Sequence, residues 1–379
     1  MKIVVLGAGL VGLPMALDLQ KEKNFKVTVC DKRTDRLQMI EKSYGLKTRQ
    51  ADFTITDELK KVIKDADLVL CAVPGFMGYK TLKTVIEARK NVVDITFFPE
   101  DLFGLDDLAR KNDVIAIADM GVAPGMSNIL CEYANQVLDE TDSIHIYVGG
   151  LPKARYWPFE YKAVFSPVDV IEEYTRPARF VRDGKIYVMP ALTDSELMDF
   201  PGVGTLEAFN SDGLRSLMKT IDCPYMIEKT LRYPGHIEKI RFLRECGFFE
   251  KQHVEIDGMK IRPVDMTAKL LFPMWEMGEQ EDITVMKIIV EGKKGGHLTR
   301  YSYDLFDEFD KATGIHSMAR TTGYAATAAL RMIANGLYDR KGISPPEYIG
   351  RRPECVSFML KQMESRGIKY HEKIEGVKR

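Results

Sequence analysis

Residues 2–12 read Lys-Ile-Val-Val-Leu-Gly-Ala-Gly-Leu-Val-Gly, a short apolar run that passes directly into the spacing Gly7-x-Gly9-x-x-Gly12. Helical spacing follows at residues 13–21, so the glycines lie between a predicted strand and a predicted helix. In that context Gly7 permits a tight turn, Gly9 lets a pyrophosphate approach the backbone, and Gly12 allows close helix–strand packing. The stretch therefore predicts a dinucleotide-binding turn, made by Gly7, Ala8, Gly9, Leu10, Val11 and Gly12.

An acidic residue follows the second predicted strand, residues 27–30, at the spacing that such a turn requires. This residue is Asp31, whose carboxylate can accept hydrogen bonds from both ribose hydroxyls and would repel a 2′-phosphate. NAD is therefore favoured over NADP. Lys32 and Arg33 come next and can neutralise a phosphate, which leaves NADP possible and makes Lys32 a further cofactor-binding candidate.

Short apolar runs recur along the first third of the chain, separated by amphipathic stretches. They lie at residues 27–30, 68–73, 92–95 and 114–118. Unalternating apolar strands between helices indicate parallel strands that are covered on both faces. The pattern predicts an α/β protein whose first domain, residues 1–123, is a doubly wound parallel sheet of the Rossmann type.

Ligands of such sheets bind at the carboxyl ends of the strands. Segments at or near these ends therefore supply further cofactor-binding candidates, namely Asp52, Ala72, Val73, Pro74 and Thr96. Asp119 ends the next predicted strand and is a catalytic candidate. A capped loop would explain Thr96 or Asp119 equally well, as a solvated carboxylate would explain Asp52.

The pattern changes after about residue 140, where short strand-like runs are broken by proline and glycine. These runs lie at residues 144–148, 163–165, 178–181 and 186–189. Two longer runs, 285–291 and 298–305, alternate around the turn residues 292–296 and predict a hairpin. We expect an α+β second domain with a mixed or antiparallel sheet over residues 124–316. C-terminal helices over residues 317–379, beginning with a helix at 317–334, are expected to pack back on the first domain.

Composition and charge narrow the classes of function. Lys and Arg number 54 against 55 Asp and Glu, a net charge of −1, whereas nucleic-acid-binding surfaces usually show as a basic excess. The least charged long stretch, residues 114–131, contains an aspartate, a proline and two glycines, so no membrane helix is expected. The six cysteines form no Cys-x-x-Cys pair and the histidines lack metal-ligand spacing, so we expect reduced thiols and no metal site. The sequence predicts a cytoplasmic protein that binds a small molecule rather than nucleic acid or a membrane.

Specific motifs lie beyond the first predicted domain, from Asp119-Met-Gly to the run Thr230-Leu-Arg-Tyr-Pro-Gly-His236. They occupy residues 119–128, 147–152, 172–178, 211–216 and 230–249. Together they resemble the motifs of the saccharopine dehydrogenase superfamily, and within it those of the L-lysine 6-dehydrogenase branch. The likeness extends from Met1 to about Tyr370.

The resemblance implies NAD-dependent oxidative deamination of the ε-amine of L-lysine to allysine, which cyclises to piperideine-6-carboxylate, by a homodimer. Two alternatives stay open. One is a saccharopine dehydrogenase or reductase, or another amino-acid or polyamine-linked oxidoreductase of the same superfamily. The other is a non-catalytic NAD-binding protein that has kept the glycine turn.

Amine oxidation requires particular side chains. Hydride leaves a C–H next to nitrogen only when the amine is neutral, and a free lysine amine has a pKa of ~10.4, so the site must desolvate it or supply a base. Among the motif residues His236 is the general-base candidate and Asp212 a second group for an amine. Arginine suits a carboxylate clamp, for which Arg232 comes first and Arg176 second; Tyr147 is a further substrate-binding candidate.

Each of these residues also has a structural explanation. Arg232 would equally fit a solvated surface arginine, and His236 an imidazole near a helix start with no chemical role. Arg176 would fit a salt bridge at a strand entry, and Asp212 the start of a helix.

Overall fold

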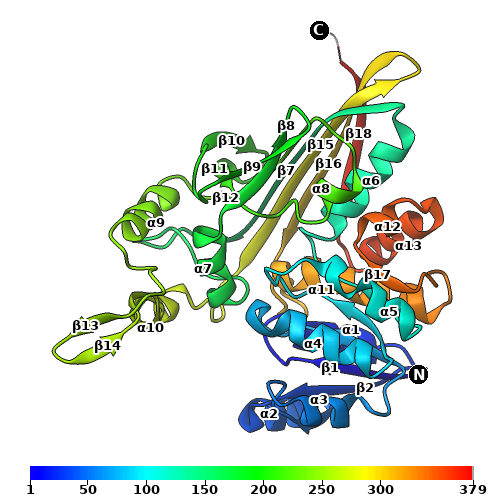
Figure 1. Cartoon of the computed structure of the whole chain (residues 1–379), viewed down its shortest axis with the longest axis vertical. Helices are drawn as coiled ribbons and strands as arrows, with labels where there is room; N and C mark the ends of the chain where they lie inside the picture. Colours follow the sequence, from blue (N-terminus) through cyan, green and yellow to red (C-terminus); the bar gives the residue numbers. More distant parts are fainter. Residues whose placement is uncertain (378–379) are drawn as a thin grey trace. The chain divides into compact units, whose positions relative to one another are not determined.

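The computed structural model describes residues 1–377, which form two compact units (Figure 1). The first unit combines residues 1–136 with residues 319–369. The second contains residues 137–318 and the segment that begins at residue 370. The first boundary thus lies after residue 136, where we expected residue 123, because a helix that follows the sixth strand still belongs to the first unit.

A seven-stranded sheet forms the centre of the first unit, and all its strands are parallel. In spatial order the strands are β17 (Gly342–Ser344), β6 (Ile115–Ile117), β5 (Asn91–Asp94), β4 (Leu68–Cys71), β1 (Lys2–Leu6), β2 (Lys26–Asp31) and β3 (Lys47–Gln50). The predicted doubly wound parallel sheet is confirmed. The last strand to join it, β17, comes from the C-terminal part of the chain, where we expected helices alone.

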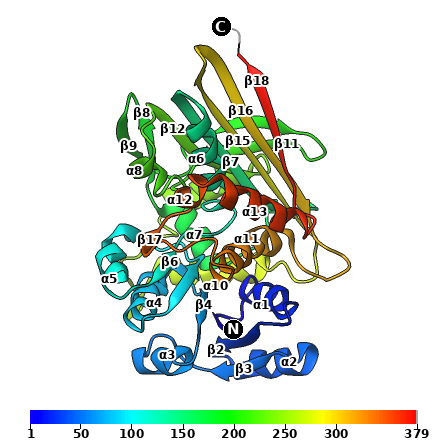
Figure 2. The same ribbon diagram turned by 90° about the vertical axis from the view of Figure 1, so that its right-hand side faces the viewer.

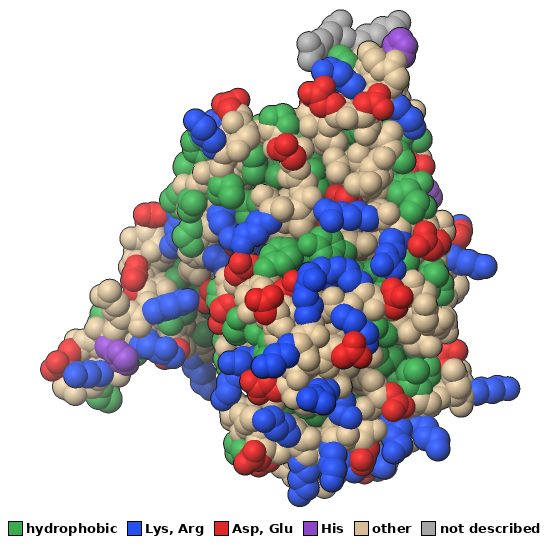
Figure 3. Space-filling model, turned by 45° about the vertical axis from the view of Figure 1, so that its right-hand side comes forward, with side chains coloured by type: hydrophobic (Ala, Val, Ile, Leu, Met, Phe, Trp, Pro, Cys, Tyr) green, Lys and Arg blue, Asp and Glu red, His purple; other side chains and the backbone are tan. Residues whose placement is uncertain are grey.

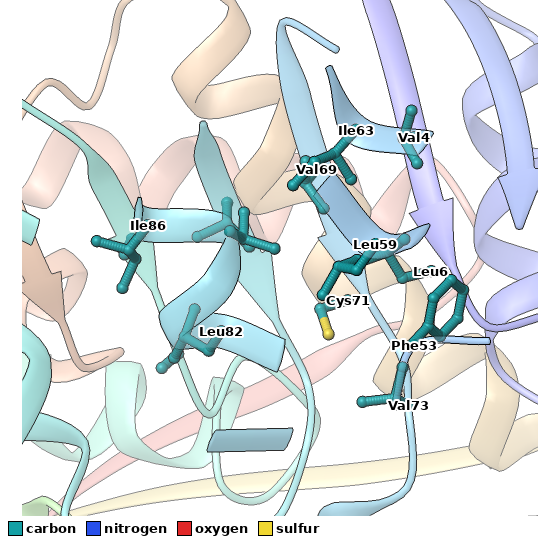
Figure 4. Close-up of a cluster of buried hydrophobic side chains, with 14 of the residues drawn as sticks. Val4, Leu6, Phe53, Leu59, Ile63, Val69, Cys71, Val73, Leu82 and Ile86 are labelled. Atoms are coloured by element: carbon teal, nitrogen blue, oxygen red, sulfur yellow. The ribbon is translucent and has the colours of Figure 1, made fainter. Parts of the chain in front are cut away.

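Helices cover both faces of this sheet. The first-unit helices are α1 (Gly12–Gln20), α2 (Thr34–Tyr44), α3 (Thr56–Ile63), α4 (Gly75–Glu87), η1 (Leu102–Leu105), α5 (Asp106–Lys111), α6 (Met126–Val137), α11 (Ser317–Ala334), α12 (Glu347–Gly350) and α13 (Pro353–Glu364). On one face Val4 and Leu6 of β1 pack with Leu59 of α3 and with α4 (Figure 4). Ile3 and Val5 alternate with them, point to the other face, and are also fully buried. Burial on both faces explains why this strand is apolar throughout.

A buried carboxylate ties the C-terminal part of the first unit to its first helix. Asp18 of α1 accepts hydrogen bonds from Thr327 and Arg331 of α11, at 2.6 and 2.7 Å, and from Arg366 after α13, at 2.9 Å. The α11 backbone also approaches α1 closely at Gly323, where a Cβ would lie 2.9 Å from the Met15 side chain. Small residues and one ion-pair network therefore hold residues 319–369 within the first unit.

The second unit is built on a nine-stranded mixed sheet. Its main path is β10 (Glu196–Phe200), β11 (Gly204–Asn210), β12 (Tyr225–Arg232), β7 (Glu140–Pro152), β15 (Asp282–Lys294), β16 (His297–Glu308) and β18 (Tyr370–Gly376). Off this path, β8 (Ala178–Arg182) pairs with β12 and with β9 (Lys185–Met189). β12 and β7 run parallel and the other pairs are antiparallel, which confirms the predicted mixed sheet.

The smaller elements of the second unit are four helices and a separate hairpin. They are α7 (Pro167–Thr175), α8 (Leu217–Thr220), α9 (His236–Glu245), α10 (Pro263–Trp275) and the pair β13 (Val254–Ile256) and β14 (Met259–Ile261). The prediction of a strand at residues 163–165 is wrong. Of these residues Ala163 alone pairs with another segment, through an isolated bridge to Glu276.

Two details of the second sheet depart from the sequence expectation. The predicted hairpin is present but longer, since Lys294 pairs with His297 and the turn is reduced to Gly295 and Gly296, both with positive φ. Residues 370–376, expected among C-terminal helices, form the edge strand β18 beside β16 (Figure 2).

Acidic and basic side chains are interspersed on the surface shown in Figure 3, in keeping with the near-neutral net charge. All six cysteines are free, and Cys246 alone among them is exposed. Among residues 1–377 no three His, Cys, Asp or Glu side chains are grouped so as to hold a metal ion. No helix in that range has the length and apolar character needed to cross a membrane.

Candidate functional site

The glycine turn of the first unit is held tightly except at one position. The Gly7 amide donates to the Cys30 carbonyl at 2.8 Å, and Gly7 has a φ of +104°. A Cβ on Gly12 would collide with the Gly7 carbonyl oxygen, and a Cβ on Gly7 would collide with that of Ala72. At Gly9, by contrast, a Cβ would meet no protein atom within 4 Å. Packing therefore requires Gly7 and Gly12, whereas Gly9 leaves its backbone open to a ligand.

Asp31 closes this turn. Its carboxylate accepts hydrogen bonds from the Ala8 amide at 2.8 Å, from the Arg33 amide at 3.0 Å and from Arg33 Nε at 3.1 Å. Burial opposes ionisation, but the bonds from Arg33 and Ala8 outweigh it and lower the pKa of Asp31. Arg36 Nε also donates to the Ala8 carbonyl at 3.2 Å. The charge of Asp31 is thus balanced by Arg33, which weakens its expected repulsion of a 2′-phosphate.

The other first-unit candidates differ in what they contact. Asp52 Oδ1 accepts hydrogen bonds from the Thr54 amide and hydroxyl, at 2.9 and 2.7 Å, and Lys32 is close enough to lower its pKa further. The Asp52 carboxylate therefore stabilises a turn, close to the side chain of Lys32. Thr96 is buried against Gly78 of α4. Asp119, with a φ of +57°, lies buried just beyond β6.

The segment Ala72-Val73-Pro74 joins β4 to α4. Ala72 lies against Gly7, Val73 belongs to the core cluster (Figure 4), and Pro74 directly precedes α4. Of the three, Ala72 is the one that directly shapes the glycine turn.

In the second unit Arg232, the last residue of β12, is buried in a hydrogen-bonded network. Its Nη2 donates to Glu173 at 2.8 Å, its Nε to the Tyr174 hydroxyl at 3.2 Å, and its Nη1 to the Leu231 carbonyl at 2.9 Å. The guanidinium also lies 4.6 Å from the centre of the Tyr161 ring. The interpretation of Arg232 as a solvated surface arginine is wrong, because the residue is only 2% exposed. All three guanidinium nitrogens donate to groups of the second unit, so few N–H groups are left to bind a substrate carboxylate.

His236 continues the same network. Its Nδ1 lies 2.7 Å from the Phe159 carbonyl and its Nε2 lies 2.9 Å from the Tyr174 hydroxyl. Since a carbonyl only accepts, Nδ1 carries the hydrogen, and Nε2 accepts from Tyr174 while Tyr174 accepts from Arg232. Burial, and then the charge of Arg232, lower the pKa of His236 to about 3. This geometry argues against the expected role as general base, because both ring nitrogens are already used.

A second polar cluster surrounds Asp212, which follows β11. Arg179 binds Asp212 in a bidentate pair, with N–O distances of 2.7 and 2.8 Å. Burial and the charge of Arg215 lower the pKa of Arg176, whereas the carboxylates of Glu172 and Asp212 raise it. Arg176 Nη2 lies 3.9 Å from Glu172 Oε2. The structure therefore brings Arg176 and Asp212 together, as it brings together Arg232 and His236.

Tyr147 does not join either cluster. It pairs with Lys229 across the β7–β12 ladder, and residues 229 and 232 point to opposite faces of β12. Its hydroxyl donates to Glu196 at 3.4 Å. A substrate-binding role shared with Arg232 is therefore not supported by the geometry.

Sequence reasoning missed Glu173, Tyr174, Arg179, Arg215 and Glu228. A signal for one of them was present in β12, where polar Glu228, Thr230 and Arg232 recur at every second position and so share one face. All three are buried. Buried polar side chains repeated along one strand face mark a polar site better than any single residue does.

Two family models together match nearly the whole chain. The "Saccharopine dehydrogenase NADP binding domain" matches residues 3–117, and the "Saccharopine dehydrogenase C-terminal domain" matches residues 121–368. The second match alone spans more than half of the chain.

Named relatives agree with these matches. A mouse mitochondrial alpha-aminoadipic semialdehyde synthase is 24% identical over 316 residues, and a Saccharomyces cerevisiae saccharopine dehydrogenase (NADP+, L-glutamate-forming) is 26% identical over 269. These alignments cover 79% and 67% of this chain, but the chain spans only 34% and 60% of the two relatives. The solved apo structure of the L-Glu-forming saccharopine dehydrogenase from Saccharomyces cerevisiae shares the fold, with a TM-score of 0.80, 21% identity and 99% coverage of both chains. The chain belongs to the saccharopine dehydrogenase family.

Proposed function

We propose that this protein is a nicotinamide-dependent oxidoreductase that oxidises the C–N bond of an amino acid of the saccharopine class. The observation that carries the proposal is the match of residues 121–368, which include residues 137–318 of the second unit, to the C-terminal domain of saccharopine dehydrogenase. The open backbone at Gly9 supports it, because a dinucleotide needs close approach at that position.

When bound, the nicotinamide ring accepts a hydride. Oxidation of saccharopine at the ε-carbon of its lysyl part, next to the secondary amine, followed by addition of water, gives glutamate and 2-aminoadipate 6-semialdehyde and releases one proton. The protein's own residues have to orient the substrate and accept that proton. His236 is unsuited to the second task, because its lone pair is occupied by Tyr174.

For the cofactor we propose NADP ahead of NAD, the reverse of the order suggested by the sequence alone. Arg33 neutralises Asp31, and Lys32 and Arg36 add positive charge beside the turn. Basic side chains at this position accommodate a 2′-phosphate. Arg33→Ser should lower kcat/KM for NADP about tenfold or more while leaving that for NAD nearly unchanged. Equal losses with both cofactors would contradict this assignment.

Oxidative deamination of lysine at its ε-carbon is a second candidate, favoured by the resemblance of the motifs between residues 119 and 249, taken together, to the lysine 6-dehydrogenase branch. It yields the same semialdehyde, with ammonia in place of glutamate. The two substrates therefore share the lysyl end and differ at the nitrogen substituent.

The deciding experiment is a substrate comparison with purified protein. Saccharopine and L-lysine are each offered with NADP and NAD, and the absorbance of the reduced cofactor is followed. The proposal expects the highest kcat/KM with saccharopine and NADP. Faster turnover of lysine would favour the second candidate, and cofactor binding without turnover of either amine would contradict both.

A further inference from the structure

The outer edge of strand β9 in the second unit is apolar and has no neighbour. Within residues 1–377 β9 pairs with β8 alone, so the backbone on its other side is open. Its last four residues are apolar and exposed: Ile186 is 54%, Tyr187 43%, Val188 61% and Met189 42% exposed. Proteins avoid exposing apolar strand edges, because such an edge pairs readily with another strand. The edge of β9 is therefore most stable when a further strand covers it.

The hairpin geometry shows which backbone groups face this edge. A two-residue turn, Asp183-Gly184, joins β8 to β9, and both of its residues have positive φ. The pair that flanks such a turn is hydrogen-bonded, and hydrogen-bonded pairs alternate along antiparallel strands. The backbone groups of Tyr187, two residues after the flanking Lys185, therefore face β8. Those of Ile186 and Val188 face the open edge.

A second copy of the same strand matches these outward groups. When two β9 strands run antiparallel across a two-fold axis at Tyr187, Ile186 lies opposite the partner's Val188. Each such pair exchanges two hydrogen bonds, and the symmetry produces the pair twice. Every amide and carbonyl of Ile186 and Val188 that faces the edge then has a partner, and Tyr187 lies opposite the partner's Tyr187 in a non-hydrogen-bonded position.

The charges around β9 fit this register. Lys185 is the only charged residue of the strand, and the two-fold axis places it opposite the partner's Met189, with the two lysines at opposite ends of the strand pair. Pro190 follows the strand and has no amide hydrogen, so the pairing stops there. The open edge strands β10 and β18 instead carry acidic residues such as Glu196 and Glu372. Apolar composition thus distinguishes the edge of β9 from these two.

The β8–β9 hairpin also has limited support from its own chain. In the described part of the chain β8 joins the main sheet only through the pairing of Val181 with Met226. A two-stranded hairpin by itself is marginally stable in water. The hairpin nevertheless carries Arg179, which pairs with Asp212 in the polar cluster. A partner strand on β9 would therefore support the element that positions Arg179.

We propose that β9 pairs with β9 of a second copy of this chain, antiparallel and centred on Tyr187, so that the two hairpins form one continuous ribbon. The rings of Phe180 and Tyr187, which stack with centroids 5.7 Å apart, lie on one face of that ribbon. Ile186 and Val188 lie on the other face. The interface involves neither the cofactor nor the substrate, so it is independent of the proposed function.

Cysteine cross-linking of the full chain tests the register. In a Cys246→Ser background, which removes the exposed cysteine, Tyr187→Cys should form a disulfide between two chains on mild oxidation. The reason is that the Cα atoms of a non-hydrogen-bonded pair lie ~4.5 Å apart, within the range of a disulfide. Ile186→Cys is the matched control. It faces the partner's Val188, so the two introduced cysteines lie farther apart than the ~7 Å that a disulfide spans.

Sedimentation velocity tests whether this edge holds the dimer together. Val188→Glu should raise the dissociation constant of the dimer about tenfold or more, because each copy then brings a carboxylate to the apolar edge. Val188 is exposed in the single chain, so circular dichroism should show an unchanged fold. Leu197→Glu places the same charge on β10, where Leu197 is 66% exposed, and as the matched control should leave the dissociation constant unchanged.

Any of four results would overturn the inference. They are a single-chain mass for the unmodified protein throughout the concentration series, a dimer that survives Val188→Glu, a dimer that Leu197→Glu dissociates instead, or disulfide formation in Ile186→Cys as efficient as in Tyr187→Cys. None of these measurements depends on turnover. A protein that oxidises neither saccharopine nor lysine would therefore refute the proposed function and leave the β9 interface in place.

Discussion

At the scale of single residues, the chain from Arg232 through Tyr174 and His236 to the Phe159 carbonyl has one direction of donation. Each polar group in it donates to the next, so the histidine must stay neutral with its hydrogen on Nδ1. Protonation of Nε2 would place a second donor against the Tyr174 hydroxyl, next to the positive charge of Arg232. His236, which its motif predicted to be a general base, is therefore kept from accepting a proton by its neighbours.

This arrangement predicts acid sensitivity. The pKa of His236 is about 3 in the folded state against 6.5 as its ordinary value, so the unfolded chain takes up the proton more readily. The free energy of unfolding should therefore fall as pH drops below about 6.5, by ~1.4 kcal/mol per unit, and level off below about pH 3.

Urea unfolding between pH 7 and pH 4 measures this slope. Carboxylates contribute to it as well, so the comparison is with His236→Gln, which cannot titrate. If the unmodified protein and the variant lose stability in parallel as pH falls, His236 is not the source.

At the scale of elements, folding and cofactor binding depend on different glycines of the glycine turn. A Cβ on Gly12 collides with the Gly7 carbonyl, whereas a Cβ on Gly9 meets no protein atom. Gly9→Ala should therefore melt like the unmodified protein but bind NADPH about tenfold more weakly or worse, because the methyl group occupies the approach of the pyrophosphate. Gly12→Ala should lose thermal stability as well. Fluorescence titration and thermal unfolding separate the two; normal NADPH affinity in Gly9→Ala would contradict the proposed binding mode.

The ion pairs that join α1 to α11 and to Arg366, which follows α13, give another prediction at this scale. Asp18 is buried between Arg331 and Arg366, and Asp18→Asn should cost about 3–5 kcal/mol of unfolding free energy, since it removes the carboxylate of both buried pairs and leaves Arg331 with Glu22 alone. Asp113→Asn is the matched control. It breaks an exposed pair with Lys341 and should cost about 0–1 kcal/mol. If urea unfolding gave the same loss of unfolding free energy for Asp18→Asn and Asp113→Asn, the buried pairs would stabilise the protein no more than the exposed pair does.

Elements differed in how far the sequence predicted them, for physical reasons. The bounds of β1 and α11 agree with the predicted ranges, because consecutive apolar residues mark the buried strand and consecutive small residues mark the closely packed helix. Strand β18 was missed because Tyr370–Gly376 is an exposed, charged edge strand with no apolar alternation. Its pairing with β16 depends on tertiary contact, which local pattern does not carry.

The candidate site divides in the same way. Gly9 and Asp31 could be located because spacing from a strand defines them. Arg179 could not, since its pairing with Asp212 joins two separate elements, whereas Glu228 was marked by the repeat of polar residues along β12. The motif around Arg232 predicted a carboxylate clamp, and the bonds to Glu173 and Tyr174 show that its charge is used within the second unit.

At the scale of the whole molecule, the family resemblance leads us to expect a homodimer. The main path of the mixed sheet ends in the open edge strands β10 and β18, and an open edge can pair with its own copy across a two-fold axis. Light scattering at micromolar concentration should give twice the chain mass of 43.1 kDa. A mass of one chain at that concentration would refute the dimer.

Strand β17 and the partners of Asp18 have a consequence for the order in which the protein is made. Residues 1–136 are made before residues 342 and 366, so β6 has no outer neighbour and Asp18 lacks Arg366 until those later residues follow. At ~5–20 residues per second the interval is on the order of 10–50 s. Throughout it the nascent first unit carries an unpaired strand edge and lacks one of the arginines that pair with Asp18, so we expect it to be prone to aggregation until residue 366 has been made.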